Sequence, residues 1–372
     1  MNQTLHRLVF ADSRNLDQLQ DNSVDLVVTS PPYPMIEMWD STFANCNPLI
    51  ADALRCHDGL AAFELMHLEL EKTWRHLARV LKPGRWVCIN VGDATRTIGN
   101  TFQLYSNHTR ITQALNSLGL HSLPLVLWRK QTNAPNKFMG SGMLPAGAYV
   151  TLEHEYILIF RKREKRVFTA TADVANRQHS AMFWEERNVW FSDTWDFKGI
   201  RQPLNHSTLR ERSAAFPFEL AYRLICMYSV KNDLVLDPFL GTGTTMFAAM
   251  AAGRNSIGVE IEANFERLID DSVRNVQRIG NEYVSRRLND HIVFIEEYQA
   301  QKGDAKHRNQ YYGFPVVTSQ ERHLRLNYIA SIAKSDPGQY LATYDNSVEI
   351  SEPQVLTRLG ANSRTIDQLE LF

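Results

Sequence analysis

The sequence has few cysteines, almost no net charge and no long apolar segment. Its 372 residues include four cysteines with no CxxC pair, which argues against a disulfide-stapled scaffold and against a structural zinc site. No apolar run approaches the roughly 18 residues that a membrane helix requires, and the first residues lack the apolar region of a signal peptide. A formal net charge of -1 gives no overall attraction to nucleic acid, so any such attraction must come from local clusters. We therefore expect a globular, cytoplasmic protein with no metal site and no membrane association.

Short apolar segments alternate with stretches of helical periodicity along most of the chain. Apolar residues recur at helical spacing over residues 63–81, and a second periodic stretch covers residues 218–228. The expected strands cover residues 7–11, 24–29, 86–91, 123–128, 155–160, 234–236 and 256–259. Strands that alternate with helices predict an α/β fold with a doubly wound, mostly parallel sheet. The strands at 123–128 and 155–160 are expected to pair as an antiparallel hairpin at the end of this sheet.

The alternation fails in one internal region and weakens at the end of the chain. Residues 161–205 open with a run of six residues of which five are basic, and they continue without a regular period, which indicates an inserted module. This region separates two halves of one α/β domain, residues 1–160 and 206–280. Residues 281–372 are expected to form a mixed extension, to which the sequence assigns no role.

A glycine-containing loop, Asp237-Pro-Phe-Leu-Gly-Thr-Gly-Thr-Thr245, joins an expected strand to an expected helix. Gly241 and Gly243 would let the backbone approach a ligand closely, and the amides at the helix start favour a negative group. The third glycine of a dinucleotide fingerprint is replaced by Met246, so a carboxylate fits better here than a pyrophosphate. Glu260 follows at the end of the next strand, where such folds bind ribose hydroxyls. The loop predicts a nucleoside cofactor with a carboxylate, although glycine turns between strand and helix also occur without a ligand.

A second loop, Thr29-Ser-Pro-Pro-Tyr33, follows an apolar strand directly. Two consecutive prolines force the chain out of the sheet at the carboxyl end of the strand, where open α/β sheets bind ligands. The prolines leave carbonyl acceptors beside the Ser30 hydroxyl, and Tyr33 offers an aromatic face. Acceptors next to a ring suit the amino group of a planar base that has been flipped out of a duplex. We predict that Ser30, Pro31, Pro32 and Tyr33 form a catalytic loop, with Ser30 and the Pro31 carbonyl as acceptors and Tyr33 as the stacking face.

With both loops in view, the chain resembles the amino DNA methyltransferases of restriction-modification systems. The catalytic motif precedes the cofactor motif, an order that is similar to the permuted β class of that family. The resemblance implies a Rossmann-like methyltransferase sheet, S-adenosylmethionine as cofactor and double-stranded DNA as substrate. It also implies a cognate restriction endonuclease as partner, in a protein that is a monomer or a homodimer. The cofactor-binding residues expected from the loops and from the resemblance are Asp12, Thr29, Phe216, Pro217, Asp237, Phe239, Gly241, Gly243, Thr244 and Glu260.

The target base is indicated by the residue at position 30. Within the family that the chain resembles, Ser-Pro-Pro-Tyr implies cytosine-N4 methylation, whereas adenine-N6 enzymes usually carry Asp or Asn in place of Ser30. Methylation at carbon five of cytosine requires a cysteine after a proline, and no cysteine of this chain follows one. The alternatives that remain are an adenine-N6 methyltransferase, a non-catalytic DNA-binding relative and, disfavoured by the motif order, an RNA or protein methyltransferase.

The basic run at the start of residues 161–205 is the candidate DNA-binding segment. Lysine and arginine there would contact phosphates or guanine edges, and interleaved aromatic residues could help to hold the opened duplex. An equally acceptable interpretation is a solvated basic turn followed by ordinary core tryptophans. The predicted DNA-binding residues are Arg161, Lys162, Arg163, Lys165, Arg166 and Arg201.

Overall fold

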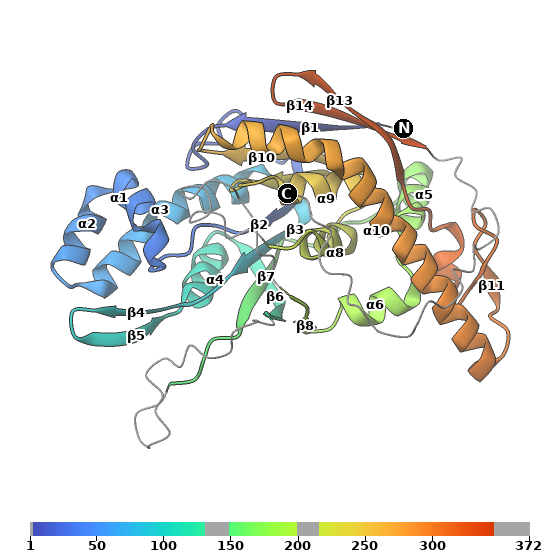
Figure 1. The fold of residues 1–372 in the computed structure, drawn as a ribbon, viewed down its shortest axis with the longest axis horizontal. Coiled ribbons are helices and arrows are strands. Elements are labelled where there is room, and N and C mark those ends of the chain that lie inside the picture. Colours follow the sequence, from blue (N-terminus) through green and yellow to red (C-terminus); the bar gives the residue numbers. More distant parts are fainter. Residues whose placement is uncertain (1–2, 131–148, 199–215, 346–372) are drawn as a thin grey trace.

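The computed structural model describes residues 3–130, 149–198 and 216–345. A ten-stranded sheet with the order β13-β14-β1-β10-β9-β2-β3-β7-β6-β8 runs through this part of the chain (Figure 1). Its strands are β1 (Gln3–Phe10), β2 (Val24–Thr29), β3 (Leu81–Val91), β6 (Leu120–Arg129), β7 (His154–Lys162), β8 (Thr194–Asp196), β9 (Leu234–Asp237), β10 (Asn255–Glu260), β13 (Tyr328–Asp336) and β14 (Gln339–Asp345). Two small hairpins lie outside it, β4 (Ala94–Ile98) with β5 (Thr101–Tyr105) and β11 (His307–Arg308) with β12 (Pro315–Val316).

The centre of the sheet is parallel. Strands β1, β10, β9, β2 and β3 are parallel neighbours, and β7 then pairs antiparallel with both β3 and β6. The prediction of a doubly wound, mostly parallel sheet with an antiparallel hairpin is therefore confirmed. β8, at the end of the sheet, pairs parallel with β6.

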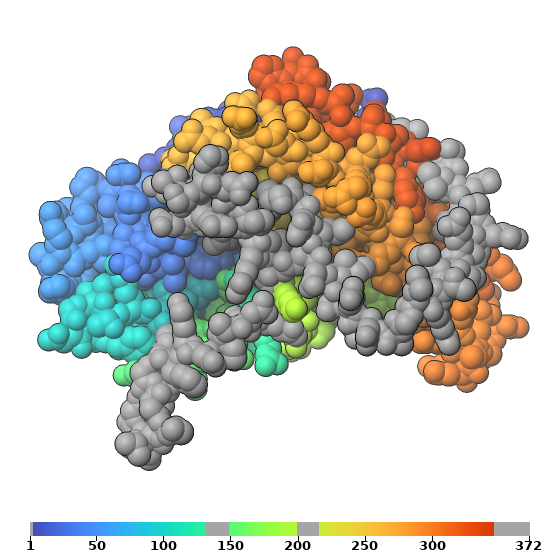
Figure 2. Space-filling model, viewed as in Figure 1, coloured from blue at the N-terminus to red at the C-terminus, as the bar shows by residue number. Residues whose placement is uncertain are grey.

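Helices cover both faces of the sheet, which explains why every residue of β2 is buried. Leu26 and Val28 of β2 belong to one core, which also contains residues of α8, α9 and α10. Val27 of the same strand belongs to the other core, which contains residues of α3 and α4. The helices are α1 (Asp40–Cys46), α2 (Pro48–Arg55), α3 (Gly59–Val80), α4 (Asn107–Ser117), α5 (Thr171–His179), α6 (Trp184–Trp190), α8 (Phe218–Tyr228), α9 (Thr244–Ala252) and α10 (Phe265–Lys302), with short 3-10 helices η1 (Glu37–Trp39) and η2 (Ser319–His323). In the space-filling view, the blue segment that contains α1 and α2 forms one end of the molecule and the orange segment that contains α10 forms the other (Figure 2).

The long helix α10 runs past the boundary that the sequence predicts at residue 280. Its buried face continues through Tyr283, Val284, Leu288 and Ile295, so the start of the expected extension belongs to the same helix. After the small β11–β12 hairpin, strands β13 and β14 add to the main sheet beside β1. Within the described residues, the C-terminal segment is thus part of the central sheet.

The predicted inserted module is also joined to the sheet, through β8. Trp195 of β8 is buried, and its indole Nε1 donates to the backbone oxygen of Trp190, which is buried as well. Phe183 and Trp128 are likewise buried. The burial of these four aromatic residues favours the interpretation as core residues over a contact with an opened duplex.

Among the described residues, no helix has a stretch both long and apolar enough to cross a membrane.

Candidate active site and cofactor cavity

A cavity opens at the carboxyl ends of the parallel strands, where the sequence predicts the ligand site. It is lined from the loops that follow β1, β2, β9 and β10, and from helices α1 and α3. The predicted site residues in its wall are Asp12, Ser30, Pro31, Pro32, Phe216, Phe239, Gly241, Thr244 and Glu260. The structure therefore brings together the catalytic loop and the glycine loop, which lie about 200 residues apart in the sequence, because parallel neighbours β2 and β9 end at the same edge.

Five of the predicted catalytic and cofactor-binding residues do not line the cavity: Thr29, Tyr33, Pro217, Asp237 and Gly243. Asp237 is 2% exposed, and its two carboxylate oxygens accept from the Thr29 and Thr245 hydroxyls, both at 2.6 Å. The backbone N–H of Phe239 donates to Asp237 at 3.0 Å. These hydrogen bonds form a brace through Asp237, which joins the end of β2 to the start of α9 behind the cavity wall.

The brace through Asp237 predicts an unusual dependence of stability on pH. Burial raises the pKa of Asp237 to about 6, although the hydrogen bonds favour the ionised form. The carboxyl binds a proton more tightly in the folded protein than in the unfolded chain, so its contribution to stability falls as pH rises through about 6. D237N removes this titration, and we expect its stability relative to the unsubstituted protein to rise by on the order of 2–3 kcal/mol between pH 4 and pH 7. Urea unfolding at a series of pH values measures the difference.

Asp270 provides the matched control, because its pKa is shifted in the opposite direction. Partial burial alone would raise it, but hydrogen bonds from Lys334 and Tyr340 lower the pKa of Asp270. The stability of D270N relative to the unsubstituted protein is therefore expected to fall as pH rises through the acid range. Parallel pH profiles of D237N and the unsubstituted protein would contradict the assignment for Asp237.

The glycine loop and Glu260 are linked by direct hydrogen bonds. The backbone N–H of Gly241 donates to Glu260 Oε2 at 2.7 Å, and the N–H of Glu262 donates to Oε1 at 2.9 Å. Burial raises the pKa of Glu260, against these two hydrogen bonds. Gly243 has a φ of 98°, and a Cβ there would lie 2.7 Å from the ring of Phe247, so only glycine fits this turn. The hydrogen bonds from Gly241 and Glu262 thus fix the Glu260 carboxylate beside the glycine loop, in the cavity wall, where it can also accept from a ligand hydroxyl.

Arg14 and Glu69 also line the cavity, although no motif of the sequence identified them. Arg14 donates to Asp12 Oδ2 at 2.6 Å and to Glu69 Oε2 at 2.7 Å. Burial alone would raise the pKa of Asp12, but the hydrogen bonds from Arg14 outweigh it and lower that pKa. A signal was present in the sequence, since Glu69 and Thr73 are polar residues at i, i+4 within the apolar face of α3. Residues of η1 and α1, among them Trp39, complete this side of the wall.

The predicted catalytic loop, residues 29–33, is held by groups from two other strands, β3 and β7. Tyr33 is 7% exposed, and its hydroxyl donates to Glu155 Oε2 at 3.1 Å. Asn90 Nδ2 donates to the Tyr33 oxygen at 2.9 Å and to Glu155 Oε2 at 2.6 Å. The Ser30 and Tyr33 hydroxyls lie 3.0 Å apart. Ser30 therefore stands between the open cavity and a buried polar network.

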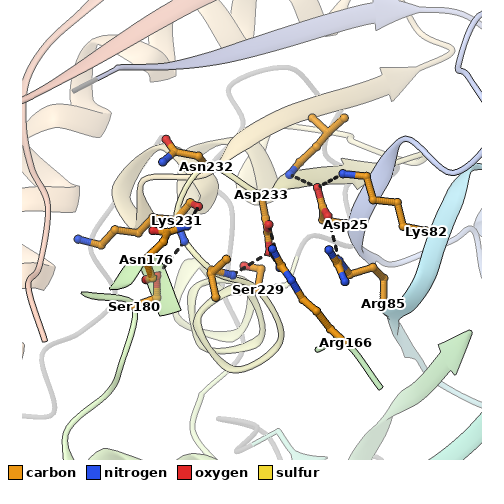
Figure 3. A network of polar contacts seen from close by, with 12 residues as sticks. Asp25, Lys82, Arg85, Arg166, Asn176, Ser180, Ser229, Lys231, Asn232 and Asp233 are labelled. Atoms are coloured by element: carbon orange, nitrogen blue, oxygen red, sulfur yellow. Dashed lines mark hydrogen bonds and ion pairs between the residues drawn. The ribbon is translucent and has the colours of Figure 1, made fainter. Parts of the chain in front are cut away.

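The basic run at 161–166 lies at the opposite edge of the sheet. Tyr156 of β7 pairs with Val91, the last residue of β3, whereas Arg161 pairs with Trp86. Arg161 therefore lies five residues, or about 17 Å, from the carboxyl end of β3. Lys162 Nζ donates to the backbone oxygen of Leu81, and Arg166 Nη1 donates to Asp233 at 2.7 Å. Figure 3 shows the Arg166 contact beside Asp25, which Lys82 and Arg85 hold.

These contacts fasten the amino ends of β2, β3 and β9. Lys162 and Arg166 are engaged within the protein, whereas Arg163 and Lys165 are exposed at the edge away from the cavity. The run thus lies away from the cavity, and the prediction that it contacts phosphates or guanine edges of DNA stays a prediction. The sixth predicted residue, Arg201, lies outside the described residues.

Comparison with known proteins places the chain in a family. Residues 24–271 match the family model described as DNA methylase. The chain is 54% identical over 327 residues to the Type II methyltransferase M.MthZI of Methanothermobacter thermautotrophicus, covering 87% of this chain and 91% of that protein. It is 44% identical over 292 residues to the Type II methyltransferase M.MjaI of Methanocaldococcus jannaschii, covering 75% of this chain and 95% of that protein.

A solved structure agrees with the sequence comparisons. The crystal structure of TTHA0409, a putative DNA modification methylase of Thermus thermophilus complexed with S-adenosyl-L-methionine, is similar with a TM-score of 0.55 and 30% identity. The match covers 73% of this chain and 95% of that one, and it confirms the expected Rossmann-like methyltransferase fold. With a family match that covers more than half of its length, the chain belongs to the DNA methylase family.

Proposed function

We propose that this protein is a site-specific DNA methyltransferase that transfers the methyl group of S-adenosylmethionine to the N4 amine of a flipped cytosine. The observation that carries the proposal is Ser30 in the wall of a cavity that also contains the glycine loop and Glu260. Membership of the DNA methylase family supports the reaction class. The choice of cytosine rests on Ser30 alone, and adenine-N6 methylation is the second candidate.

The residues of the cavity fit the proposed cofactor. The Thr244 hydroxyl is buried in the wall and has no hydrogen-bond partner among the described residues, so a ligand group would satisfy it. The first amides of α9 directly follow this loop and, as at any helix start, lack intrahelical acceptors, which favours a carboxylate there. Glu260 and Asp12 offer acceptors for hydroxyl and amino groups, and Phe216 and Phe239 supply apolar surface. S-adenosylmethionine, with which TTHA0409 was crystallised, combines these groups.

When bound, the cofactor supplies an electrophilic methyl group on a sulfonium. The task left to the protein is to present a weak nucleophile, because the lone pair of an exocyclic amine is delocalised into the base. Ser30 and the Pro31 carbonyl accept hydrogen bonds from the amine and hold its nitrogen closer to tetrahedral. Pro31 and Pro32 keep the loop stiff, so the acceptors are in place before the base arrives.

The substrate and the partner follow from the same proposal. DNA is expected to approach the carboxyl ends of the parallel strands, because the cavity that Ser30 lines opens there. Residues 161–205 remain the proposed target-recognition region. The proposed partner is a restriction endonuclease that cuts the DNA sequence that this enzyme methylates. The enzyme itself is proposed to be a monomer or a homodimer. The names of the two similar Type II methyltransferases support a role in a restriction-modification system.

Expression of the chain in a host that lacks DNA methylation tests the proposal. We expect nucleoside analysis of the host DNA to show N4-methylcytosine, and single-molecule sequencing to place it at one recurrent sequence. N6-methyladenine in place of N4-methylcytosine would establish the second candidate. Methyl transfer to RNA but not to duplex DNA, or no transfer at all, would refute DNA methylation; host DNA without the gene is the control.

A further inference from the structure

The Tyr33 hydroxyl is the centre of a hydrogen-bond chain that leads from the cavity into the protein. Its oxygen is close to three groups: Ser30 Oγ at 3.0 Å, Asn90 Nδ2 at 2.9 Å and Glu155 Oε2 at 3.1 Å. The other Glu155 oxygen is contacted by Lys130 Nζ. Asn90 is 2% exposed and Glu155 9%, so this chain is largely removed from water.

The donors and acceptors of these groups fix the direction of every bond. An ionised carboxylate has no hydrogen, so the bond between Tyr33 and Glu155 uses the phenolic hydrogen. Asn90 can reach the Tyr33 oxygen only as a donor through its Nδ2. Because the one hydroxyl hydrogen of Tyr33 is donated to Glu155, the Tyr33 oxygen can only accept a hydrogen bond from Ser30. Burial, followed by the charge of Glu155, raises the pKa of Tyr33 well above its usual value, so the phenol keeps this hydrogen.

The consequence appears at Ser30. Its hydroxyl hydrogen is then directed to Tyr33, so both lone pairs of Oγ are left to accept, and Ser30 lines the cavity. We propose that Glu155, through Tyr33, is a positioning residue that makes Ser30 an acceptor toward the amine of the target base. This inference rests on the proposed function and deepens it, because it assigns the Tyr33 hydroxyl and Glu155 a role in that reaction.

The ring of Tyr33 is closely packed. The residue is 7% exposed. Gly92 lies against it, and a Cβ there would come within 3.1 Å of the ring and 3.3 Å of Glu155 Cγ. The ring is held in place so that its oxygen reaches Ser30 and Glu155 together.

The test compares Y33F, E155Q and the double variant under single-turnover conditions. Y33F removes the acceptor for the Ser30 hydrogen and keeps the ring. E155Q introduces an amide that can donate to the Tyr33 oxygen, so the Tyr33 hydrogen is free to turn toward Ser30 and reverse the chain. We expect each variant to lower the rate of methyl transfer by roughly 10-fold to 100-fold, the value of one directed hydrogen bond. Affinities for S-adenosylmethionine and for DNA should stay within about 3-fold, since neither contact is lost.

The double variant separates this role from independent contributions. Groups that act through one path are not additive, so Y33F/E155Q should be no slower than the slower single variant. Y344F is the matched control, because Tyr344 is a buried phenol on β14 bonded to Thr4 and to the Met250 oxygen, away from the cavity; its rate should match that of the unsubstituted enzyme.

Two results would overturn the inference while the unsubstituted enzyme methylates DNA. One is a normal rate in Y33F or E155Q, and the other is a double variant whose loss is the product of the single losses. An unsubstituted protein that transfers no methyl group to DNA would instead refute the proposed function, and the inference with it.

Discussion

Replacement of Ser30 by alanine is expected to slow methyl transfer by roughly 100-fold to 1000-fold, which is the usual effect of removing one preorganised polar group from an active site. The expected loss is larger than in Y33F, because S30A deletes the acceptor itself rather than its orientation. Affinity for S-adenosylmethionine should change little, since the cofactor contacts proposed above belong to the glycine loop, Asp12 and Glu260. Single-turnover transfer of a labelled methyl group measures the rate, and calorimetry measures cofactor binding.

The matched control for this prediction is S285A. Ser285 lies on α10, and its hydroxyl is 3.2 Å from that of Tyr328, away from the cavity. S285A should retain the full rate. A rate in S30A within a few-fold of the unsubstituted enzyme, or a loss of cofactor affinity that matches the loss of rate, would contradict the role given to Ser30.

The second large effect is expected on stability, at Arg287. This residue of α10 donates to both carboxylate oxygens of Glu186 on α6 and, at 2.8 Å, to the hydroxyl of Tyr222 on α8. The side chains of Arg287 and Glu186 are only 5% and 11% exposed. R287M leaves the Glu186 charge buried without its partner, so we expect the free energy of unfolding to fall by about 3–5 kcal/mol. Urea titration followed by circular dichroism measures it.

Two further variants identify the cause. R278A breaks an exposed i, i+4 pair with Glu282 on the same helix and should cost less than about 0.5 kcal/mol. E186Q/R287M removes both charges and should recover much of the stability lost in R287M. If R287M were as mild as R278A, or if E186Q/R287M recovered nothing, the buried pair would not be what joins α10 to α6.

The sequence predicted the parts of the fold in which local pattern and tertiary role coincide. β2 is an apolar run between two helix-covered faces, so its pattern alone identifies a buried strand. The glycine loop and the proline loop were recognisable because backbone geometry restricts their residues to few types. Once both were placed at strand ends, the parallel sheet made their meeting at one cavity a geometric requirement.

The remaining features depend on contacts between distant segments. The α10 pattern weakens after residue 280 because Gly280, Arg287 and His291 occupy buried positions of an otherwise apolar face, and each is accounted for by a partner in space. Glu155 lies 122 residues from Tyr33, so no spacing rule joins them. The basic run shows the same limit, because no local pattern reveals that Asp233, a residue 67 positions away from Arg166, binds that side chain.

The brace through Asp237 has a consequence for how such a chain can be rearranged in evolution. The hydrogen bonds from Thr29 and Thr245 to Asp237 join two loops through space. They do not depend on which of the two loops comes first in the chain. The first described strand lies beside the last, with Gln3 opposite Thr343. A gene joined from β14 to β1 and opened between β8 and α8 would encode the glycine loop before the proline loop and could retain the same sheet, the same brace and the same cavity. Motif order can therefore differ between such enzymes as a record of gene fusion and cleavage, with no change in the chemistry that the folded protein performs.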